Sequence, residues 1–161
     1  MKVKEIMTSS PVVCDLNESL AEAAKTMWES DCGVLPVLKD GKEVVGLITD
    51  RDICMALAMR DCGSAAVSAE EVITGNVYAV KPEDEIQEAL LLMQQHQVRR
   101  LPVVSPDGQL EGMLSLNDII LESKETAAGD VPQITHADVI NTYKTICEHR
   151  QPLQLGATAA R

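Results

Sequence analysis

The chain has 161 residues and a formal net charge of −11, from 14 basic and 25 acidic side chains, and 45% of its residues are hydrophobic. This hydrophobic content excludes disorder throughout the chain, and the negative charge argues against partners such as nucleic acid or an anionic membrane surface. The longest apolar run, residues 53–59, is far shorter than the roughly 20 residues that span a bilayer, and no signal peptide is visible. The five cysteines form no C-x-x-C pair, so we expect free thiols in the cytoplasm.

The first part of the chain predicts a short strand, a helix, a hairpin and a second helix. Asn17 is the expected N-cap of the first helix, and Asp40-Gly41 is a turn signal between the two hairpin strands. Pro36 places its strand at an edge or at a sheet end. In chain order these elements are expected at residues 12–14, from residue 20, at 32–38, at 44–48 and at 50–59.

The same order of elements is predicted a second time, followed by one more helix. The second set is expected at residues 77–80, 83–95, 98–104, 110–114 and 116–123. A loose capping box at Thr135 to Asp138 then opens an amphipathic helix that ends before Pro152. We expect repeat 1 at residues 1–59, a linker at 60–71, repeat 2 at 72–123, a linker and the C-terminal helix at 124–150, and a disordered tail at 151–161.

The two sets of elements are an internal repeat. A shift of 66 residues places 6–53 on 72–119 without a gap, and 10 of the 48 aligned pairs are identical. The identities include Leu35-Pro36-Val37 with Leu101-Pro102-Val103, and Gly46 with Gly112. A copied unit of this length predicts an α+β fold in which two β-α-β-β-α units pack about a pseudo-two-fold axis, because neither unit buries its apolar face alone. Two equivalent crevices are expected where the copies meet.

Each copy ends its last strand with the same phrase: Gly46-Leu47-Ile48-Thr49-Asp50-Arg51-Asp52-Ile53 and Gly112-Met113-Leu114-Ser115-Leu116-Asn117-Asp118-Ile119. Seen once, the hydroxyl followed three residues later by Asp is a helix cap. A helix N-terminus also suits phosphate, and an ionised Asp can accept both hydroxyls of a ribose diol. Arg51 lies between them in copy one and can pair with a phosphate, whereas Asn117 replaces it in copy two. The phrase can therefore hold ribose and phosphate together.

The repeated pattern resembles a tandem pair of cystathionine beta-synthase (CBS) domains, also called a Bateman module. The resemblance covers about residues 3–123 and rests on motifs that recur in order in both copies. They are Ile6-Met7-Thr8 and Val72-Ile73-Thr74, the segments around the two Leu-Pro-Val motifs, and the phrases at 46–53 and 112–119.

The resemblance implies an adenosine-containing ligand, such as AMP, ADP, ATP, NAD or S-adenosylmethionine, between the copies. It implies that Asp52 and Asp118 hold ribose and that Thr49 and Ser115 meet phosphate. Segments implied near the ligand are Ser10-Pro11-Val12, Asn76-Val77-Tyr78, Gly33-Val34 and Arg99-Arg100. The arginine pair can equally be a solvated strand end, because strand alternation lets one of the two face the cleft. Which copy's strand completes which site stays open.

Other candidate residues fit less specific roles. The three dispersed His residues lack metal-ligand spacing, so no metal site is expected. Cys14, Cys32 and Cys54 align with aliphatic residues and are expected in the core, which leaves Cys62 as a mild redox candidate. No set of nucleophile, base and orienting residue appears, so no enzyme and no required cofactor are expected.

The sequence therefore predicts a nucleotide-binding regulatory module, a homodimer that passes a conformational change to a partner. One alternative is an energy- or redox-state sensor that regulates an enzyme or transporter in trans. A structural dimerisation module with vestigial sites is the main alternative, and a weak nucleotide hydrolase is another. The C-terminal helix either caps its own module, packs on its own dimer or binds a partner.

Overall fold

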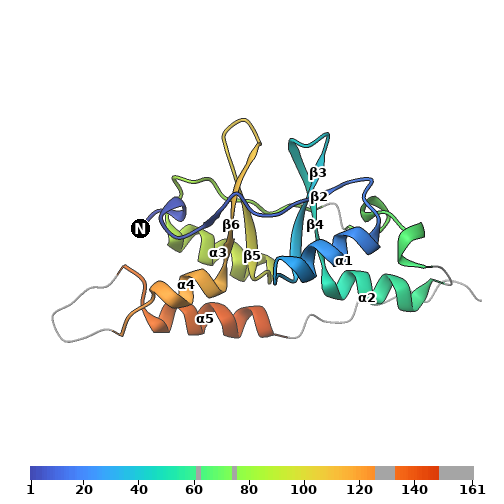
Figure 1. The fold of residues 1–161 in the computed structure, drawn as a ribbon. Helices are drawn as coiled ribbons and strands as arrows, with labels where there is room; N and C mark the ends of the chain where they lie inside the picture. Colours follow the sequence, from blue (N-terminus) through green and yellow to red (C-terminus); the bar gives the residue numbers. More distant parts are fainter. Residues whose placement is uncertain (61–62, 74–75, 126–132, 149–161) are drawn as a thin grey trace, which may run out of the picture.

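The computed structural model describes residues 1–60, 63–73, 76–125 and 133–148. Two halves stand side by side, each with a three-stranded sheet above its helices (Figure 1), which confirms the predicted α+β pair of units. One sheet has the order β2-β3-β4 and the other the order β1-β6-β5. The strands are β1 (Thr8–Ser9), β2 (Cys14–Asp15), β3 (Val34–Lys39), β4 (Glu43–Thr49), β5 (Arg100–Val104) and β6 (Leu110–Ser115). Cys62, Thr74 and the predicted tail at 151–161 lie outside the described residues, as do parts of both predicted linkers.

The helices follow the repeat, with one addition at the end. Ser19, not Asn17, is the N-cap of the first helix, because its hydroxyl accepts from the Glu22 amide while the Glu22 carboxylate bonds back to the cap. The last helix packs on α3 and α4. The helices are α1 (Leu20–Glu29), α2 (Asp50–Met59), α3 (Ile86–His96), α4 (Leu116–Glu122) and α5 (His136–Cys147), with short 3-10 turns at Val3–Glu5, Ser64–Ala66 and Ala69–Glu71.

Two strand predictions need correction. The segment 77–80 is not a strand, since Val80 alone pairs there, in a bridge to Val103. Pro36 lies in β3, which is the middle strand of its sheet. The residue is tolerated there because β2 pairs only with Val37 and Leu38, so at Pro36 the strand has its β4 neighbour on one side alone.

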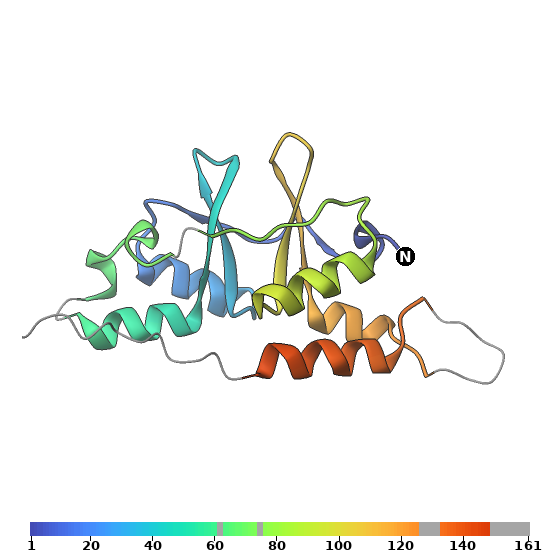
Figure 2. The same cartoon turned by 180° about the vertical axis from the view of Figure 1, so that it is seen from behind.

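The two copies exchange their leading segments. Strand β1, at the start of copy one, pairs antiparallel with β6 of copy two, and Val3 is buried in the core of copy two. Reciprocally, Val67 and Ala69, which precede copy two, are buried in the core of copy one. The two crossing segments pass between the halves, one visible in blue from the front and the other in green from behind (Figure 1, Figure 2). Neither half completes its core from its own repeat.

Charge pairs hold the first leading segment on copy two. The amine of Met1 and the Nζ of Lys2 lie 3.1 and 2.7 Å from the two carboxylate oxygens of Glu85, and Lys4 pairs with Glu83 at 2.5 Å. The hydrogen bond from Lys2, followed by that from the Met1 amine, holds the pKa of Glu85 below its ordinary value. These pairs are exposed and contribute little individually; the buried Val3 side chain is the stronger anchor.

The exchange explains the glycine that opens both terminal phrases. A Cβ added to Gly112 would lie 2.7 Å from Met7 Sδ and 2.8 Å from the carbonyl oxygen of Thr8. A Cβ on Gly46 would lie 2.9 Å from Cδ1 of Ile73, the residue that corresponds to Met7 in the repeat. The crossing segment of each half therefore passes so close to the other half's last strand that no side chain fits there.

The cysteines differ in exposure. Cys14 is buried and Cys32 is half-buried, but Cys54 is exposed, so the expectation of a core position is wrong for Cys54. Its repeat counterpart, Ile120, is itself 45% exposed, so alignment with an aliphatic residue did not indicate burial. Burial, assisted by the nearby Glu18 carboxylate, raises the pKa of the Cys14 thiol to about 12.

We predict that Gly112→Ala lowers the melting temperature, because the clash includes a backbone oxygen that cannot rotate away. Overpacking of this kind costs about 1–3 kcal/mol, and each kcal/mol shifts the melting temperature by about 2–4 °C at this chain length. Gly46→Ala should cost less because the three atoms nearest its added Cβ all belong to the Ile73 side chain. Gly63→Ala is the matched control, with no atom near its added Cβ; equal melting temperatures for Gly112→Ala and Gly63→Ala would contradict this packing account.

We also predict that iodoacetamide spares Cys14 in the native protein at neutral pH, because the reactive thiolate is suppressed by the raised pKa and the side chain is buried. The exposed Cys54 and Cys147 should be alkylated first, as measured by peptide mass spectrometry over time. In urea all of these thiols should react alike. Early alkylation of Cys14 without denaturant would show that the copy-one core opens far more readily than this packing allows.

Candidate functional site

The hydroxyl and carboxylate of each terminal phrase form the cap of the helix that follows. In copy one, the Thr49 hydroxyl donates to Asp52 Oδ2 at 2.7 Å, and the Asp52 amide donates back to the hydroxyl at 3.2 Å. The Thr49 amide donates to the same carboxylate oxygen at 3.0 Å. Ser115 and Asp118 repeat these contacts at 2.7, 3.2 and 2.7 Å. The helix-cap interpretation of the phrase is thus realised in both copies.

The cap still leaves each aspartate able to bind a ligand. All three cap contacts fall on the Thr49 hydroxyl and on Asp52 Oδ2, and in the described part of the chain no hydrogen bond to Oδ1 is found. Both aspartates are half-buried. The cap therefore fixes the carboxylate in one orientation and leaves Oδ1 to accept a hydroxyl group. The Thr49 hydroxyl, by contrast, already donates to Asp52, so a contact to phosphate requires it to exchange that bond.

The first cleft combines the cap of copy one with strand and loop residues of copy two. It has a volume of about 600 Å³. Thr49 and Asp52 line one side, and Asn76, Tyr78 and Arg100 line the other. The remaining lining residues are Leu47, Gln95, His96, Gln97 and Val98. The cleft therefore takes its strand residues from copy two and its cap from copy one, a pairing that the sequence left open.

The second cleft is the counterpart of the first under the repeat. It has a volume of about 360 Å³ and combines the cap of copy two with residues of copy one. Eight of its positions correspond to lining positions of the first cleft, among them Ser115 to Thr49 and Asp118 to Asp52. The lining residues are Thr8, Ser10, Pro11, Val12, Ser30, Cys32, Val34, Pro36, Arg100, Met113, Ser115 and Asp118.

The clefts differ in chemistry. In the first, the ring of Tyr78 stacks on His96 with centroids 3.6 Å apart and planes at 13°. The corresponding side chains in the second cleft are Val12 and Ser30, which offer no such aromatic face. Arg100 lines both clefts from the first position of β5. The first cleft is therefore the more polar and the larger of the two.

Most residues singled out from the sequence lie in one of the two clefts, and five do not. Gly33 lines a different groove, on the helical side of copy one. Arg51, Asn117 and Arg99 are exposed and Val77 is half-buried, and none of these four lines either cleft. Of the arginine pair, Arg100 is thus the one that lines the clefts. Of the two cations considered for phosphate, Arg100 lines both clefts and Arg51 lines neither.

Several lining residues were not anticipated. His96 and Cys32 lie shortly before the Leu-Pro-Val motifs, and Thr8 lies at the repeat start. The repeat contained a signal for Thr8, since it is identical to Thr74. His96 and Ser30 share an aligned position but differ in type, so nothing in the sequence marked them.

Neither a metal cluster nor a membrane span is found in the part of the chain that the structure describes. There, no three His, Cys, Asp or Glu side chains lie close enough together to hold a metal ion. None of the helices there has the length and apolar character needed to cross a bilayer.

Comparison with known proteins identifies the same unit twice. A family model for the CBS domain matches residues 3–59 and 69–125. Hypoxic response protein 1 of Mycobacterium tuberculosis is 34% identical over 124 residues, which cover 77% of this chain and 86% of that protein. A homoserine O-acetyltransferase of Methanohalobium evestigatum is 30% identical over 117 residues, which are 73% of this chain but only 23% of that enzyme.

Solved structures agree with this fold. The crystal structure of Hypoxic Response Protein I with two coordinated zinc ions has a TM-score of 0.70 at 32% identity, covering 77% of this chain and all of that one. The CBS domain pair of protein MJ0100, in complex with 5'-methylthioadenosine and S-adenosyl-L-methionine, has a TM-score of 0.66 at 28% identity, covering 74% and 92%. CBSX2 in complex with AMP has a TM-score of 0.63 at 25% identity, covering 74% and 93%.

Proposed function

The chain belongs to the CBS domain family, and from that premise we propose that it is a regulatory module that binds an adenosine-containing ligand between its two repeats. The observation that carries the proposal is the first cleft, where the fixed carboxylate of Asp52 faces Tyr78 and Arg100 of the other copy. A carboxylate for ribose hydroxyls, an aromatic pair for a purine and a cation for phosphate are the three groups that an adenine nucleotide requires. Two related CBS pairs have been crystallised with adenosine derivatives.

We propose different ligand preferences for the two clefts. The first offers Asn76, Arg100 and the Tyr78–His96 pair, which favour a phosphorylated nucleotide such as AMP, ADP, ATP or NAD. The second is smaller and lined by Val12, Val34 and Met113, which favour a less charged derivative such as S-adenosylmethionine. Arg100 borders both, so a phosphate at one cleft changes the field at the other.

We propose binding rather than catalysis as the task of the clefts. Of the described residues, Asp52 is the one carboxylate that lines the first cleft, and Asp118 is the one that lines the second. Each is committed to its helix cap and, in this proposal, to ribose, so neither serves as a general base. The ligand would act by favouring one arrangement of the two copies, which an enzyme or transporter in trans reads. A cytoplasmic location and the proposed repeat boundaries remain predictions.

We further propose a homodimer. Helices α2 and α4, which correspond in the repeat, expose large apolar side chains at equivalent positions, Met55 (49% exposed) and Leu121 (81%), and Met59 extends this surface on α2 (79%). Apolar stripes of this kind on a two-fold related pair of helices suit an isologous interface.

The ligand prediction is tested by thermal shift with AMP, ADP, ATP, NAD, NADH and S-adenosylmethionine on protein freed of carried-over nucleotide. A ligand at 100 times its dissociation constant adds about 2.7 kcal/mol to the folded state, which is a shift of several degrees. Asp52→Ala should remove the shift caused by phosphorylated ligands, measured against the variant's own unliganded melting temperature.

Asp138→Ala is the matched control for that variant. Asp138 caps α5 through Thr135 with the same three contacts, at 2.9, 2.7 and 3.1 Å, and lines neither cleft. It should lose about 0.5–2 kcal/mol of stability as a cap and keep the full ligand shift. A flat panel on the wild-type protein would instead support the dimerisation module with vestigial sites.

The dimer prediction is tested by light scattering after size-exclusion chromatography. The wild-type mass should be twice 17.4 kDa, and Met55→Glu with Leu121→Glu should halve it, because each places a charge in an apolar interface. Leu91→Glu is the control, since Leu91 is similarly exposed, at 54%, but lies on α3. A wild-type monomer would contradict the homodimer.

A further inference from the structure

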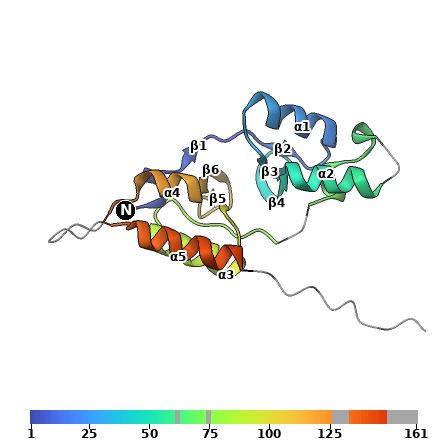
Figure 3. The ribbon, with the colours of Figure 1, turned by 90° about the horizontal axis from the view of Figure 1, so that it is seen from below.

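The helical face of copy two is covered by α5, which the CBS family match does not include (Figure 3). Val139 of α5 is buried in the copy-two core. Two glutamines on and beside α3 fix the helix: Gln94 donates to the Thr142 hydroxyl at 2.7 Å, and Gln97 donates to the carbonyl oxygens of Thr145 and Glu148 at 3.1 Å each. This face of a repeat is therefore built to receive a helix.

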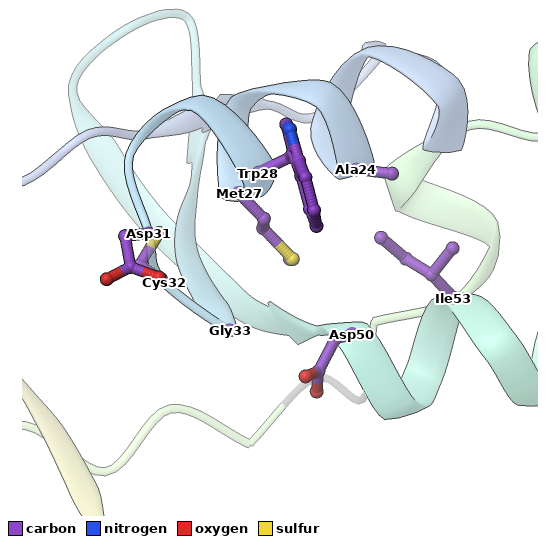
Figure 4. A pocket seen from close by; sticks show the side chains of 8 residues that line it. All are labelled: Ala24, Met27, Trp28, Asp31, Cys32, Gly33, Asp50 and Ile53. Atoms are coloured by element: carbon purple, nitrogen blue, oxygen red, sulfur yellow. The ribbon is translucent and has the colours of Figure 1, made fainter.

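The corresponding face of copy one has no such cover in the described structure. It forms a groove of about 420 Å³ between α1 and α2 (Figure 4). Met27 and Ile53 line its apolar floor, and Trp28 stands over it with 88% of its surface exposed. Together with the apolar floor beneath it, the exposed Trp28 ring forms an apolar surface of the kind that marks interaction sites.

The repeat alignment shows how the chemistry of this face has changed. Gln94 and Gln97 of copy two correspond to Trp28 and Asp31 of copy one. Both side-chain amides that donate to α5 are thus replaced, one by an aromatic ring and one by a carboxylate. A helix that presents carbonyl oxygens there, as the C-terminal end of α5 does to Gln97, would meet the negative charge of Asp31.

The negative charge at the groove favours a cationic segment over a second copy of this chain as its occupant. Asp31 and Asp50 stand on its rim, and both are exposed. A second copy docked through the same face would bring these carboxylates toward their own equivalents on a chain that already carries −11. A cationic segment gains from the same two charges.

We propose that this groove docks an amphipathic helix of a partner protein. Its apolar stripe would cover Met27, Trp28 and Ile53, and a Lys or Arg beside the stripe would reach Asp31 and Asp50. The inference rests on the proposed regulatory function in one respect, namely that the protein which docks here is the regulated partner.

The groove and the first cleft share one turn of helix. Asp50 lines the groove, while Thr49 and Asp52, next to it, line the ligand cleft. The Asp50 amide donates to the carbonyl oxygen of Gly33 at 3.3 Å, which ties this turn to the start of β3. A ligand that shifts the cap of α2 therefore acts directly on one wall of the groove.

Trp28 is the one tryptophan in the chain, so its fluorescence reports on the groove itself. The probe is a 20-residue helical peptide with leucines on one face and lysines on the other, titrated without nucleotide. Docking should shift the Trp28 emission to the blue and saturate. A peptide with glutamate in place of lysine should give no shift, because Asp31 and Asp50 repel it.

Protein variants distinguish binding of the peptide in the groove from nonspecific attraction of a cationic peptide to an acidic protein. Asp31→Asn with Asp50→Asn should weaken the Leu/Lys peptide about fivefold, and Glu111→Gln with Asp107→Asn, the same charge change at exposed sites away from the groove, should leave affinity unchanged. Trp28→Gln, which installs the copy-two residue, should weaken binding about 30-fold or more when read by the anisotropy of a dye-labelled peptide.

Three results would overturn the proposal: no emission shift with the Leu/Lys peptide, equal weakening by the groove and control variants, or a blue shift that grows with protein concentration alone, which would make a second copy the occupant. The titration needs no nucleotide. If no ligand shifts the melting temperature, the peptide titration can therefore still be interpreted. If the peptide does not bind, the thermal-shift result is unaffected.

Discussion

The close approach of each leading segment to the glycine of the other copy's last strand is the constraint on which the rest of this molecule depends. Met7 and Thr8 pass over Gly112, and Ile73 passes over Gly46. Because of this exchange, each core contains residues from outside its own repeat, among them Val3 in copy two and Val67 in copy one. The same crossing carries residues 10–12 into one cleft, and Asn76 and Tyr78 into the other, opposite the cap of the other copy. Folding and the proposed ligand binding thus depend on the same crossing of the leading segments.

In the proposed function, a single aspartate in each cleft has two tasks, to cap a helix and to bind the ligand. As a cap, Asp52 stabilises the first turn of α2 through Oδ2, and the cap in turn holds Oδ1 in a fixed direction. This preorganisation would lower the entropic cost of binding a ligand. It also places the ligand contact in the turn that forms one wall of the groove beneath Trp28. The proposed binding of an anionic ligand is compatible with the net charge of −11, because Arg100 supplies a local positive charge to both clefts.

The repeat made the unit, its helices and the two cap motifs predictable, since apolar periodicity and a hydroxyl three residues before Asp are local signals. Choices between near neighbours were not predictable. Ser19 was preferred over Asn17 as a cap because Glu22 completes its capping box. Arg100 faces the clefts and Arg99 does not, since β5 begins at Arg100 opposite Ser115. Strand alternation predicted that one of the two arginines faces the clefts, but it did not predict which one. A cover on its own module was one of the roles that the sequence left open for the C-terminal helix. The sequence could not choose among them, because the cover by α5 depends on hydrogen bonds from Gln94 and Gln97 to a helix about 48 residues away.

The central claim is that each binding site is built from both copies. Crystals grown with whichever phosphorylated nucleotide gives the largest thermal shift test it most directly. The account predicts density in the first cleft, with ribose hydroxyls on Asp52 Oδ1 and the phosphate toward Arg100 of the other copy. A nucleotide that contacts residues of only one copy, or that lies outside both clefts, would contradict it.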